Sequence, residues 1–307
     1  MCGLTTTGKT IWNKRAHLAV AGILTAAMFA FAPTPALAQN DPNPGALTFT
    51  GVFDVPTVYV FRGIVQELDP SFTVQPAGDL GIALASGEGG LKSAAVNFGV
   101  WHSLQTGSAG SDGPTGKLHY EEDFYATLNL GFGGGITLGT TYMALTSPNN
   151  MFATVKEMQF KVSKAHWLNP YGFLAFELSD DGQADGGHTF GGSKGTYLEL
   201  GVGPSFPLGK DVATLAVPVK LGLGLSNYYE QFNTDNSITS DEFGFFDVGG
   251  LVTFPLKGVP SSFGSWNVHA GLDLLFLGDM TRNLNRGADG NDSSTQAVFL
   301  FGIGLTY

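Results

Sequence analysis

Apolar residues alternate with polar or small residues in segment after segment of this chain, and no other feature limits its fold so strongly. In the final segment Phe299, Phe301, Ile303, Leu305 and Tyr307 share one face, and Leu300, Gly302, Gly304 and Thr306 lie on the other. A period of two is the side-chain repeat of a β-strand. The pattern therefore predicts an all-β protein in which each strand has one strongly apolar face.

Twelve such segments follow one another along the chain. They span 46–64, 71–85, 91–104, 119–132, 135–146, 152–166, 171–179, 194–205, 212–228, 242–255, 265–278 and 294–307. Most connections alternate between short turns rich in Gly and Pro and longer loops rich in Asp and Asn. This arrangement with an even strand count is typical of outer-membrane barrels. We therefore predict a transmembrane antiparallel up-and-down β-barrel of about 12 strands, with both termini on the periplasmic side.

The composition agrees with a sheet that faces lipid. Charged residues make up 13% of the chain, about half the usual share of a soluble domain, and 44 of the 307 residues are glycine. Beyond residue 40 no apolar run reaches the length of a membrane-spanning helix. A sheet in lipid must close on itself, because lipid cannot pair the backbone of a free edge. The alternative is an exported soluble β-sandwich, in which one face of each strand packs against a second sheet.

Aromatic residues stand near the ends of several segments, where the girdles of a membrane barrel are expected. We predict this position for Tyr120, Phe132, Tyr142, Trp167, Tyr171, Phe206, Phe254, Trp266 and Tyr307. The closing residues Phe299, Phe301, Ile303, Leu305 and Tyr307 also resemble the C-terminal signal of outer-membrane barrels. The predicted partners are accordingly the barrel assembly machinery, membrane lipids and lipopolysaccharide.

Residues 1–38 have the features of a cleaved secretory signal peptide. A positive region with Lys9, Lys14 and Arg15 precedes 14 apolar residues at 18–31, and Ala36-Leu37-Ala38 matches a cleavage site. The alternative is a membrane anchor, but 14 apolar residues are too few to span comfortably. Cleavage removes the one cysteine and leaves a single barrel domain at 39–307. The net charge, −11 for the whole chain, then becomes more negative, which argues against a nucleic-acid partner.

The segment Thr57-Val-Tyr-Val-Phe-Arg-Gly-Ile-Val-Gln66 carries a recognisable motif. Its members are Tyr59, Phe61, Arg62, Gly63, Ile64, Gln66, Asp69 and Pro70. The segment resembles an early strand of the Gcw_chp family of Gram-negative outer-membrane proteins, and 79–83 and 97–103 resemble its next two strands. The resemblance implies a barrel in the outer membrane and no particular activity. Asp54-Val-Pro56 interrupts the strand just before the motif.

The faces opposite the aliphatic ones gather the charged residues, which we expect to face the lumen. They are Arg62, Asp123, Glu157, Lys161, Glu177, Glu199, Lys220, Asp247, His269 and Asp273. Such residues set ion selectivity in an open pore, or pair with one another and fill a closed barrel. We predict a narrow passive channel, porin-like, for small solutes. The alternative is a closed structural or surface-interaction barrel without transport.

Arg62 has two interpretations of its own. A guanidinium on the pore wall can bind a carboxylate or phosphate of a solute. The structural interpretation, which we favour, is an ion pair with a loop carboxylate such as Glu67 or Asp69.

Catalysis is not expected. Adjacent residues of a strand point to opposite faces, so His102 and Ser103 do not form a dyad, and His269 and Asp273 are about 13 Å apart along a strand. The histidines lack the spacing of a metal site, and the acidic segments 179–185 and 288–292 lack the spacing of a calcium loop. The sequence thus indicates no catalytic residue, metal or cofactor, and a lipid hydrolase is a disfavoured third hypothesis.

Overall fold

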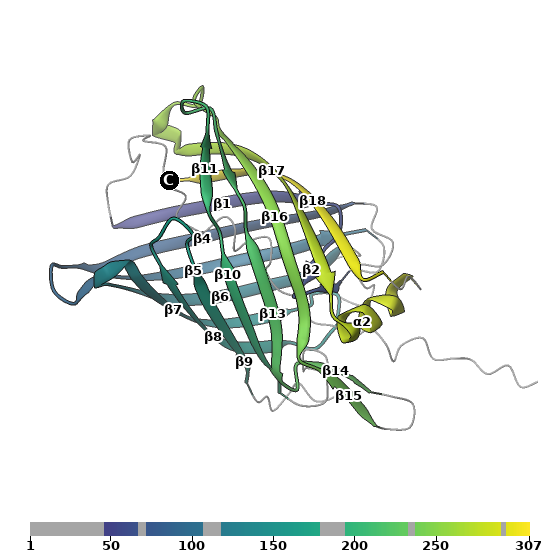
Figure 1. Cartoon of the computed structure of the whole chain (residues 1–307). Coiled ribbons are helices and arrows are strands. Elements are labelled where there is room, and N and C mark those ends of the chain that lie inside the picture. The colour runs from purple at the N-terminus through teal and green to yellow at the C-terminus, as the bar shows by residue number, and fades with distance from the viewer. Residues whose placement is uncertain (1–45, 67–71, 107–117, 179–193, 233–236, 290–292) are drawn as a thin grey trace, which may run out of the picture.

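The computed structural model forms a closed antiparallel β-barrel (Figure 1). It describes residues 46–66, 72–106, 118–178, 194–232, 237–289 and 293–307. The predicted signal peptide lies outside these residues. Each strand of the wall pairs with its neighbours in chain order, and the last strand pairs with the first, so that the sheet has no free edge.

Twelve strands make up the wall, which confirms the predicted fold class. They are β1 (Leu47–Pro56), β4 (Thr73–Ser86), β5 (Leu91–Gln105), β6 (His119–Phe132), β7 (Ile136–Thr146), β8 (Val155–Lys164), β9 (Tyr171–Glu177), β10 (Thr196–Val202), β13 (Val219–Ser226), β16 (Phe243–Pro255), β17 (Ser265–Leu277) and β18 (Thr295–Thr306). β11 (Ser205–Leu208) and β12 (Ala213–Ala216) extend β10 and β13 beyond short interruptions. Pro218 lies at the second interruption, where its missing N–H cannot support a ladder.

The two ends of the barrel differ in their connections. One end has short turns at 87–90, 133–135, 165–170, 209–212 and 256–264, two of which contain 3-10 turns, η2 (Gly133–Gly135) and η3 (Ser261–Phe263). The other end has the longer connections and the elements β14 (Tyr229–Phe232), β15 (Ile238–Asp241) and α2 (Asp279–Asp289). In outer-membrane barrels the short turns are periplasmic and the long loops extracellular. β1 begins and β18 ends at the end with the short turns, which this rule assigns to the periplasm.

The outer face of the wall is apolar. Exposed side chains on it include Leu80, Phe98, Phe124, Leu128, Phe160, Val162, Leu200, Phe246, Leu274, Phe276, Phe299 and Phe301. An apolar band of this extent around a closed barrel matches the hydrocarbon of a bilayer. The protein is therefore a β-barrel of the bacterial outer membrane.

Seven of the nine predicted girdle aromatics lie on the outside of the barrel, six on the outer face of the wall and Trp167 in the turn 165–170; all are exposed except Trp266, which is half-buried. The prediction is wrong for Tyr120 and Tyr171, which point inward. Tyr171 shares the inner face of β9 with buried Phe173. Tyr120 is the additional residue at a bulge between β5 and β6, where Ser103 pairs with Glu121 but Leu104 pairs with His119. A bulge breaks the alternation, so parity fails there.

The predicted first strand, 46–64, is wrong beyond Pro56. The chain leaves the wall at Pro56 and enters the barrel, where residues 57–66 form a small hairpin of β2 (Val60–Phe61) and β3 (Ile64–Val65). We call residues 57–66 the inner hairpin. Its two-residue turn is Arg62-Gly63, both in the left-handed region with φ of 43° and 87°. Two-residue turns with positive φ at both positions suit the twist of a hairpin.

At the extracellular end, α2 contacts β3, β14, β15 and β16. Within the described part of the chain, no helix is both long and apolar enough to cross a membrane.

Candidate functional site: the barrel interior

Arg62, at the tip of the inner hairpin, is tied to the wall by a buried ion pair. Its Nη1 and Nη2 donate to Oε1 and Oε2 of Glu157 on β8, each at 2.9 Å. Nη1 also donates to the hydroxyl of Tyr228 at 2.6 Å. Gln159, two residues along β8, donates to Glu157 Oε2 at 2.7 Å. Bidentate arginine–carboxylate pairs are among the strongest hydrogen bonds in proteins, so this pair anchors the hairpin.

Aromatic rings surround the Arg62 guanidinium. Its central carbon lies 4.4 Å from the ring centroid of Tyr197 and 4.6 Å from that of Phe61. The rings of Tyr228 and Phe173 lie at 5.3 and 5.7 Å. Such ring faces attract a cation, most strongly where water is excluded. They offset part of the cost of burying the charge.

The structure gives Arg62 a partner that neither interpretation from the sequence named. The guanidinium binds a carboxylate, but one on the protein's own wall, and two of its nitrogens are thereby occupied. Glu67 and Asp69, the expected loop partners, lie outside the described residues. Arg62 therefore fixes the inner hairpin inside the lumen. We call the inner hairpin together with the aromatic residues around Arg62 the plug.

The extracellular half of the interior is filled with apolar side chains. The inner hairpin contributes Val58, Tyr59, Val60, Phe61 and Ile64. The wall and the extracellular loops contribute Trp101, Tyr120, Met143, Leu145, Phe152, Phe173, Tyr197, Tyr228, Tyr229, Phe245, Leu275 and Met280. The side chains of Phe61, Tyr197, Tyr229 and Phe245 are fully buried. This half of the lumen is closed like the core of a soluble domain.

Helix α2 holds the inner hairpin from the extracellular side. The side chain of Asn285 accepts a hydrogen bond from the Val65 N–H at 2.9 Å and donates to the Gly63 carbonyl at 3.0 Å. Thr281, also on α2, donates to the Gly244 carbonyl of the wall at 2.6 Å. The helix thus links the turn of the hairpin to β16.

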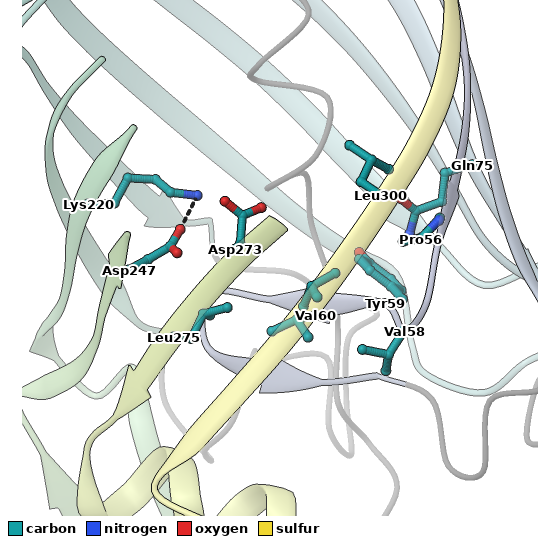
Figure 2. A pocket seen from close by; sticks show the side chains of 11 residues that line it. Pro56, Val58, Tyr59, Val60, Gln75, Lys220, Asp247, Asp273, Leu275 and Leu300 are labelled. Atoms are coloured by element: carbon teal, nitrogen blue, oxygen red, sulfur yellow. Dashed lines mark ion pairs between the residues drawn. The ribbon is translucent and has the colours of Figure 1, made fainter. Parts of the chain in front are cut away.

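A charged layer lies beneath the plug. Lys220 Nζ is 2.7 Å from Asp247 Oδ2, and Figure 2 shows the two side chains pointing toward one another beside Asp273. Glu199 accepts hydrogen bonds from the hydroxyls of Tyr171 and Tyr197 at 2.6 and 2.8 Å. A cavity of about 40 Å³ separates this layer from Tyr59 and Val60 of the hairpin. Its volume is enough for a few water molecules.

Polar side chains continue the interior toward the periplasm. The amide of Asn97 donates to Asp79 at 2.6 Å, and Asn129 donates to Asn97 at 3.0 Å. The hydroxyls of Thr127 and Thr141 are 2.8 Å apart. The asparagine and threonine side chains are half-buried, in contrast to the aromatic layer above, whereas Asp79 is buried. Across Gly302 of β18, His269 Nε2 on β17 lies 2.8 Å from Asp54 Oδ1 on β1.

The ten residues predicted to face the lumen all lie on the hairpin or on the inner side of the wall. Eight are buried, and Lys161 and Asp273 are half-buried. Three of the ten have not been described above. Glu177 accepts a hydrogen bond from the Gly195 N–H at 2.6 Å, and Asp123 is buried beside Glu121. Lys161 Nζ lies 4.5 Å from the centroid of the Tyr171 ring.

Sequence reasoning missed three interior carboxylates, Asp54, Asp79 and Glu121. The alternation contained the signal for Glu121, which is two residues from Asp123 on the same face. Tyr228 and Tyr229 were also missed, because the sequence placed Tyr228 at the end of the predicted strand 212–228 and Tyr229 at the start of a loop, whereas the observed strand ends at Ser226.

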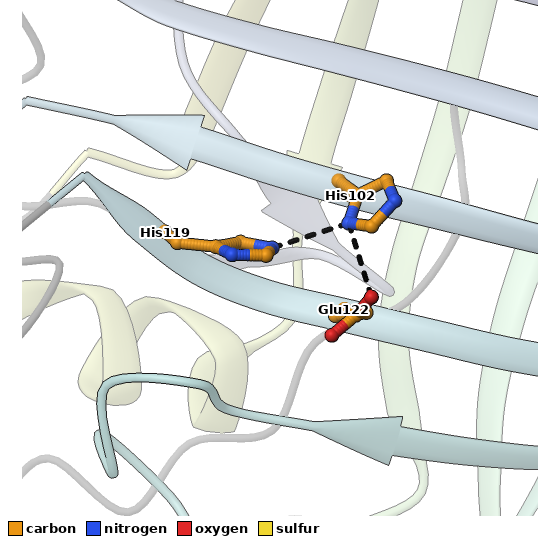
Figure 3. A group of neighbouring side chains, drawn as sticks. All are labelled: His102, His119 and Glu122. Carbon is orange, nitrogen blue, oxygen red and sulfur yellow. Dashed lines mark hydrogen bonds and ion pairs between the residues drawn. The ribbon is translucent and has the colours of Figure 1, made fainter. Parts of the chain in front are cut away.

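On the outer face, His102, His119 and Glu122 come together near the extracellular end of β5 and β6 (Figure 3). His102 and Glu122 pair directly across the ladder, and His119 joins them beside the bulge. Sequence spacing did not indicate this group, because the ladder brings together residues far apart in the chain. His102 and Ser103 point to opposite sides of the wall, and Ser103 is buried. The acidic segment 179–185 and residues 290–292 of the second one lie outside the described residues.

Comparisons with known proteins find only weak similarity to this chain. No family model matches the chain, so membership of the Gcw_chp family stays a prediction, and no curated protein matches. The COG4313 outer-membrane channel from Pseudomonas putida F1 is 11% identical with a TM-score of 0.45, over 87% of this chain and 97% of that one. The outer-membrane phospholipase from Salmonella typhi, a dimer with bound calcium, is 11% identical with a TM-score of 0.43, over 88% and 94%. The NanC porin is 9% identical with a TM-score of 0.40, over 85% and 99%. At these scores the similarity says nothing about function, and the strand pairing of this chain alone defines its barrel.

Proposed function

We propose that this barrel is a narrow passive channel for small solutes whose resting conformation is closed by the inner hairpin. The observation that supports the proposal is the Arg62–Glu157 pair, which holds the hairpin in an extracellular half filled with apolar side chains, above a polar interior on the periplasmic side. Among the described residues the inner hairpin is the centre of this closure, and it is held by the Arg62–Glu157 pair, by α2 and by the Tyr229 hydroxyl, which donates to the Arg62 carbonyl. Displacement of the hairpin opens a path.

The charges inside favour cations over anions. Described carboxylates on the inner side are Asp54, Asp79, Glu121, Asp123, Glu157, Glu177, Glu199, Asp247 and Asp273. The described lysines and arginines there are Arg62, Lys161 and Lys220. Rings of carboxylates favour cations in a pore. The open state is accordingly cation-preferring.

A closed barrel without transport is the second candidate. The complete burial of Phe61, Tyr197 and Phe245 favours it, because a packed aromatic core resists opening. The two candidates differ in whether small solutes can pass through the lumen when the inner hairpin is removed.

Planar-bilayer conductance tests the proposal. In one variant residues 58–65 are replaced by eight alternating Gly and Ser residues, which removes the apolar plug and Arg62 but keeps the connection. The matched control has the same replacement at 256–263, in a periplasmic turn. We expect rare, small openings for the wild type and the control, and frequent, larger, cation-preferring steps for the hairpin variant. A hairpin variant that is folded, as shown by heat-modifiable mobility on a gel, but silent contradicts the channel and supports the closed barrel.

Selectivity is tested in the open background of the hairpin variant. Lys220→Glu replaces a cation beside Asp247 with a third carboxylate near Asp273, so the reversal potential under a salt gradient shifts further toward cations. Lys257→Glu in a periplasmic turn makes the same charge change outside the interior and serves as the control. An unchanged reversal potential in Lys220→Glu contradicts a conducting path past this layer.

A further inference from the structure

The group His102, His119 and Glu122 lies on the outer surface of the barrel. His102 stands between Trp101 and Ser103, and Glu122 between Glu121 and Asp123, all of which are buried in the interior. Alternation therefore turns His102 and Glu122 outward. His102 is three residues from the end of β5 and His119 is the first residue of β6. At about 3.3 Å per residue, the group lies within about 10 Å of the extracellular strand ends.

The ligand atoms of this group already lie at the spacing of a metal site. His102 Nδ1 is 3.1 Å from His119 Nε2 and 3.8 Å from Glu122 Oε1, and the three ligand atoms all lie within 4.8 Å of one another. Two ligands at about 2.0–2.1 Å from a tetrahedral zinc ion are about 3.3 Å apart. Side-chain rotations alone are enough to close the set around an ion, because both strands stay fixed by their ladder.

The donor types select a class of ion. Two imidazole nitrogens and one carboxylate oxygen suit Zn²⁺ and neighbouring transition metals, whereas Ca²⁺ and Mg²⁺ prefer oxygen alone. The side chains of His102 and Glu122 are 24% and 28% exposed, so no neighbouring side chain closes the group and a fourth position is open on the outer side. Figure 3 shows the three side chains converging from two adjacent strands.

We propose that His102, His119 and Glu122 form a binding site for a divalent transition metal, with Zn²⁺ as its reference ion, on the outer extracellular rim of the barrel. The ion cross-links β5 and β6 next to the connection between them. This site is independent of the lumen and of the channel proposed above.

The test uses the purified full-length protein in detergent micelles, titrated with Zn²⁺ by calorimetry and with Co²⁺ by visible absorption, whose intensity reports tetrahedral coordination. We expect one equivalent of saturable binding. His102→Gln and His119→Gln each weaken it by about 10- to 100-fold or more, since changes to outer-shell partners alone cost that much. The matched control is His166→Gln, which changes an exposed histidine in a periplasmic turn and leaves the affinity unchanged.

Glu122→Gln is a further variant that keeps both histidines and the size of the side chain. It is expected to retain folding and to lose affinity. Absence of saturable binding in the wild type overturns the proposal. So does wild-type affinity in a folded His102→Gln, His119→Gln double variant, which would place the metal elsewhere.

Discussion

The extracellular and periplasmic halves of the barrel share one wall but have opposite interiors. In the extracellular half the inner residues are bulky, as Trp101, Phe173 and Phe245 are, and they are buried against the inner hairpin. In the periplasmic half the inner residues are small or polar, as Thr127, Asn129 and Thr141 are, and these three are half-buried and linked in polar pairs.

This difference shows that the alternation of a strand sets only which side faces inward. What the inside becomes depends on the sizes of the inward residues and on the segment that fills the space between them. In an eight-stranded barrel the inward side chains just fill the interior. A 12-stranded barrel is wider, so its inward side chains leave space in the lumen. Here a hairpin from the chain occupies that additional space in one half only.

The largest expected effect concerns the ion pair that holds the plug. Glu157→Ala leaves the buried Arg62 charge without its carboxylate, and breaking a buried pair in this way costs about 3–5 kcal/mol. Urea unfolding of the protein in lipid vesicles measures this change. Glu88→Ala, in an exposed periplasmic turn, is the control and is expected to cost under about 1 kcal/mol. Equal losses in the two variants would mean that the halves do not differ in the strength of their ion pairs.

A smaller effect is expected where α2 meets the hairpin. Asn285→Ala removes two hydrogen bonds to the turn, worth about 1–2 kcal/mol together, so the openings become about tenfold more frequent. Single-channel recording measures the opening frequency. Asn283→Ala, on the exposed side of the same helix, keeps the wild-type frequency. Equal frequencies in both variants would show that α2 does not hold the hairpin.

The smallest effect belongs to the periplasmic half. Thr127→Ala removes one half-exposed hydroxyl pair with Thr141, and we expect a loss of about 1 kcal/mol in the free energy of unfolding, without a change in opening frequency. The same two assays measure it. A loss as large as that of Glu157→Ala would show that the periplasmic interior is packed as tightly as the extracellular one.

The strands were predictable from the sequence because their signal is local. Eleven of the twelve predicted segments end within a few residues of the observed strands, since each strand has its own alternation and its own turn residues. The inward direction of Glu157, Lys220 and Asp247 follows from the same parity. Parity failed at Tyr120, where a bulge adds a residue that no local pattern announces.

The inner hairpin was not predictable in this way. Residues 57–64 alternate like a wall strand, and Pro56 was noticed only as an interruption. Val58, Tyr59 and Phe61 find apolar surroundings inside the barrel because five strands of the wall, β5, β6, β9, β10 and β16, supply buried aromatic residues around them. That environment exists only after the sheet has closed.

The sequence by itself therefore determined the wall: the all-β class, the approximate strand count, the side of each strand that faces lipid, and the extracellular position of the long loops. Only the tertiary structure decided the contents of the lumen, the pairing of Arg62 with Glu157, and the meeting of His102, His119 and Glu122. The physical reason is the range of the interactions. The alternation of apolar and polar residues is a local pattern, because each residue faces either lipid or the lumen. The plug, the Arg62–Glu157 pair across 95 residues and the three ligands on two strands depend on contacts between distant segments, which form only when the barrel closes.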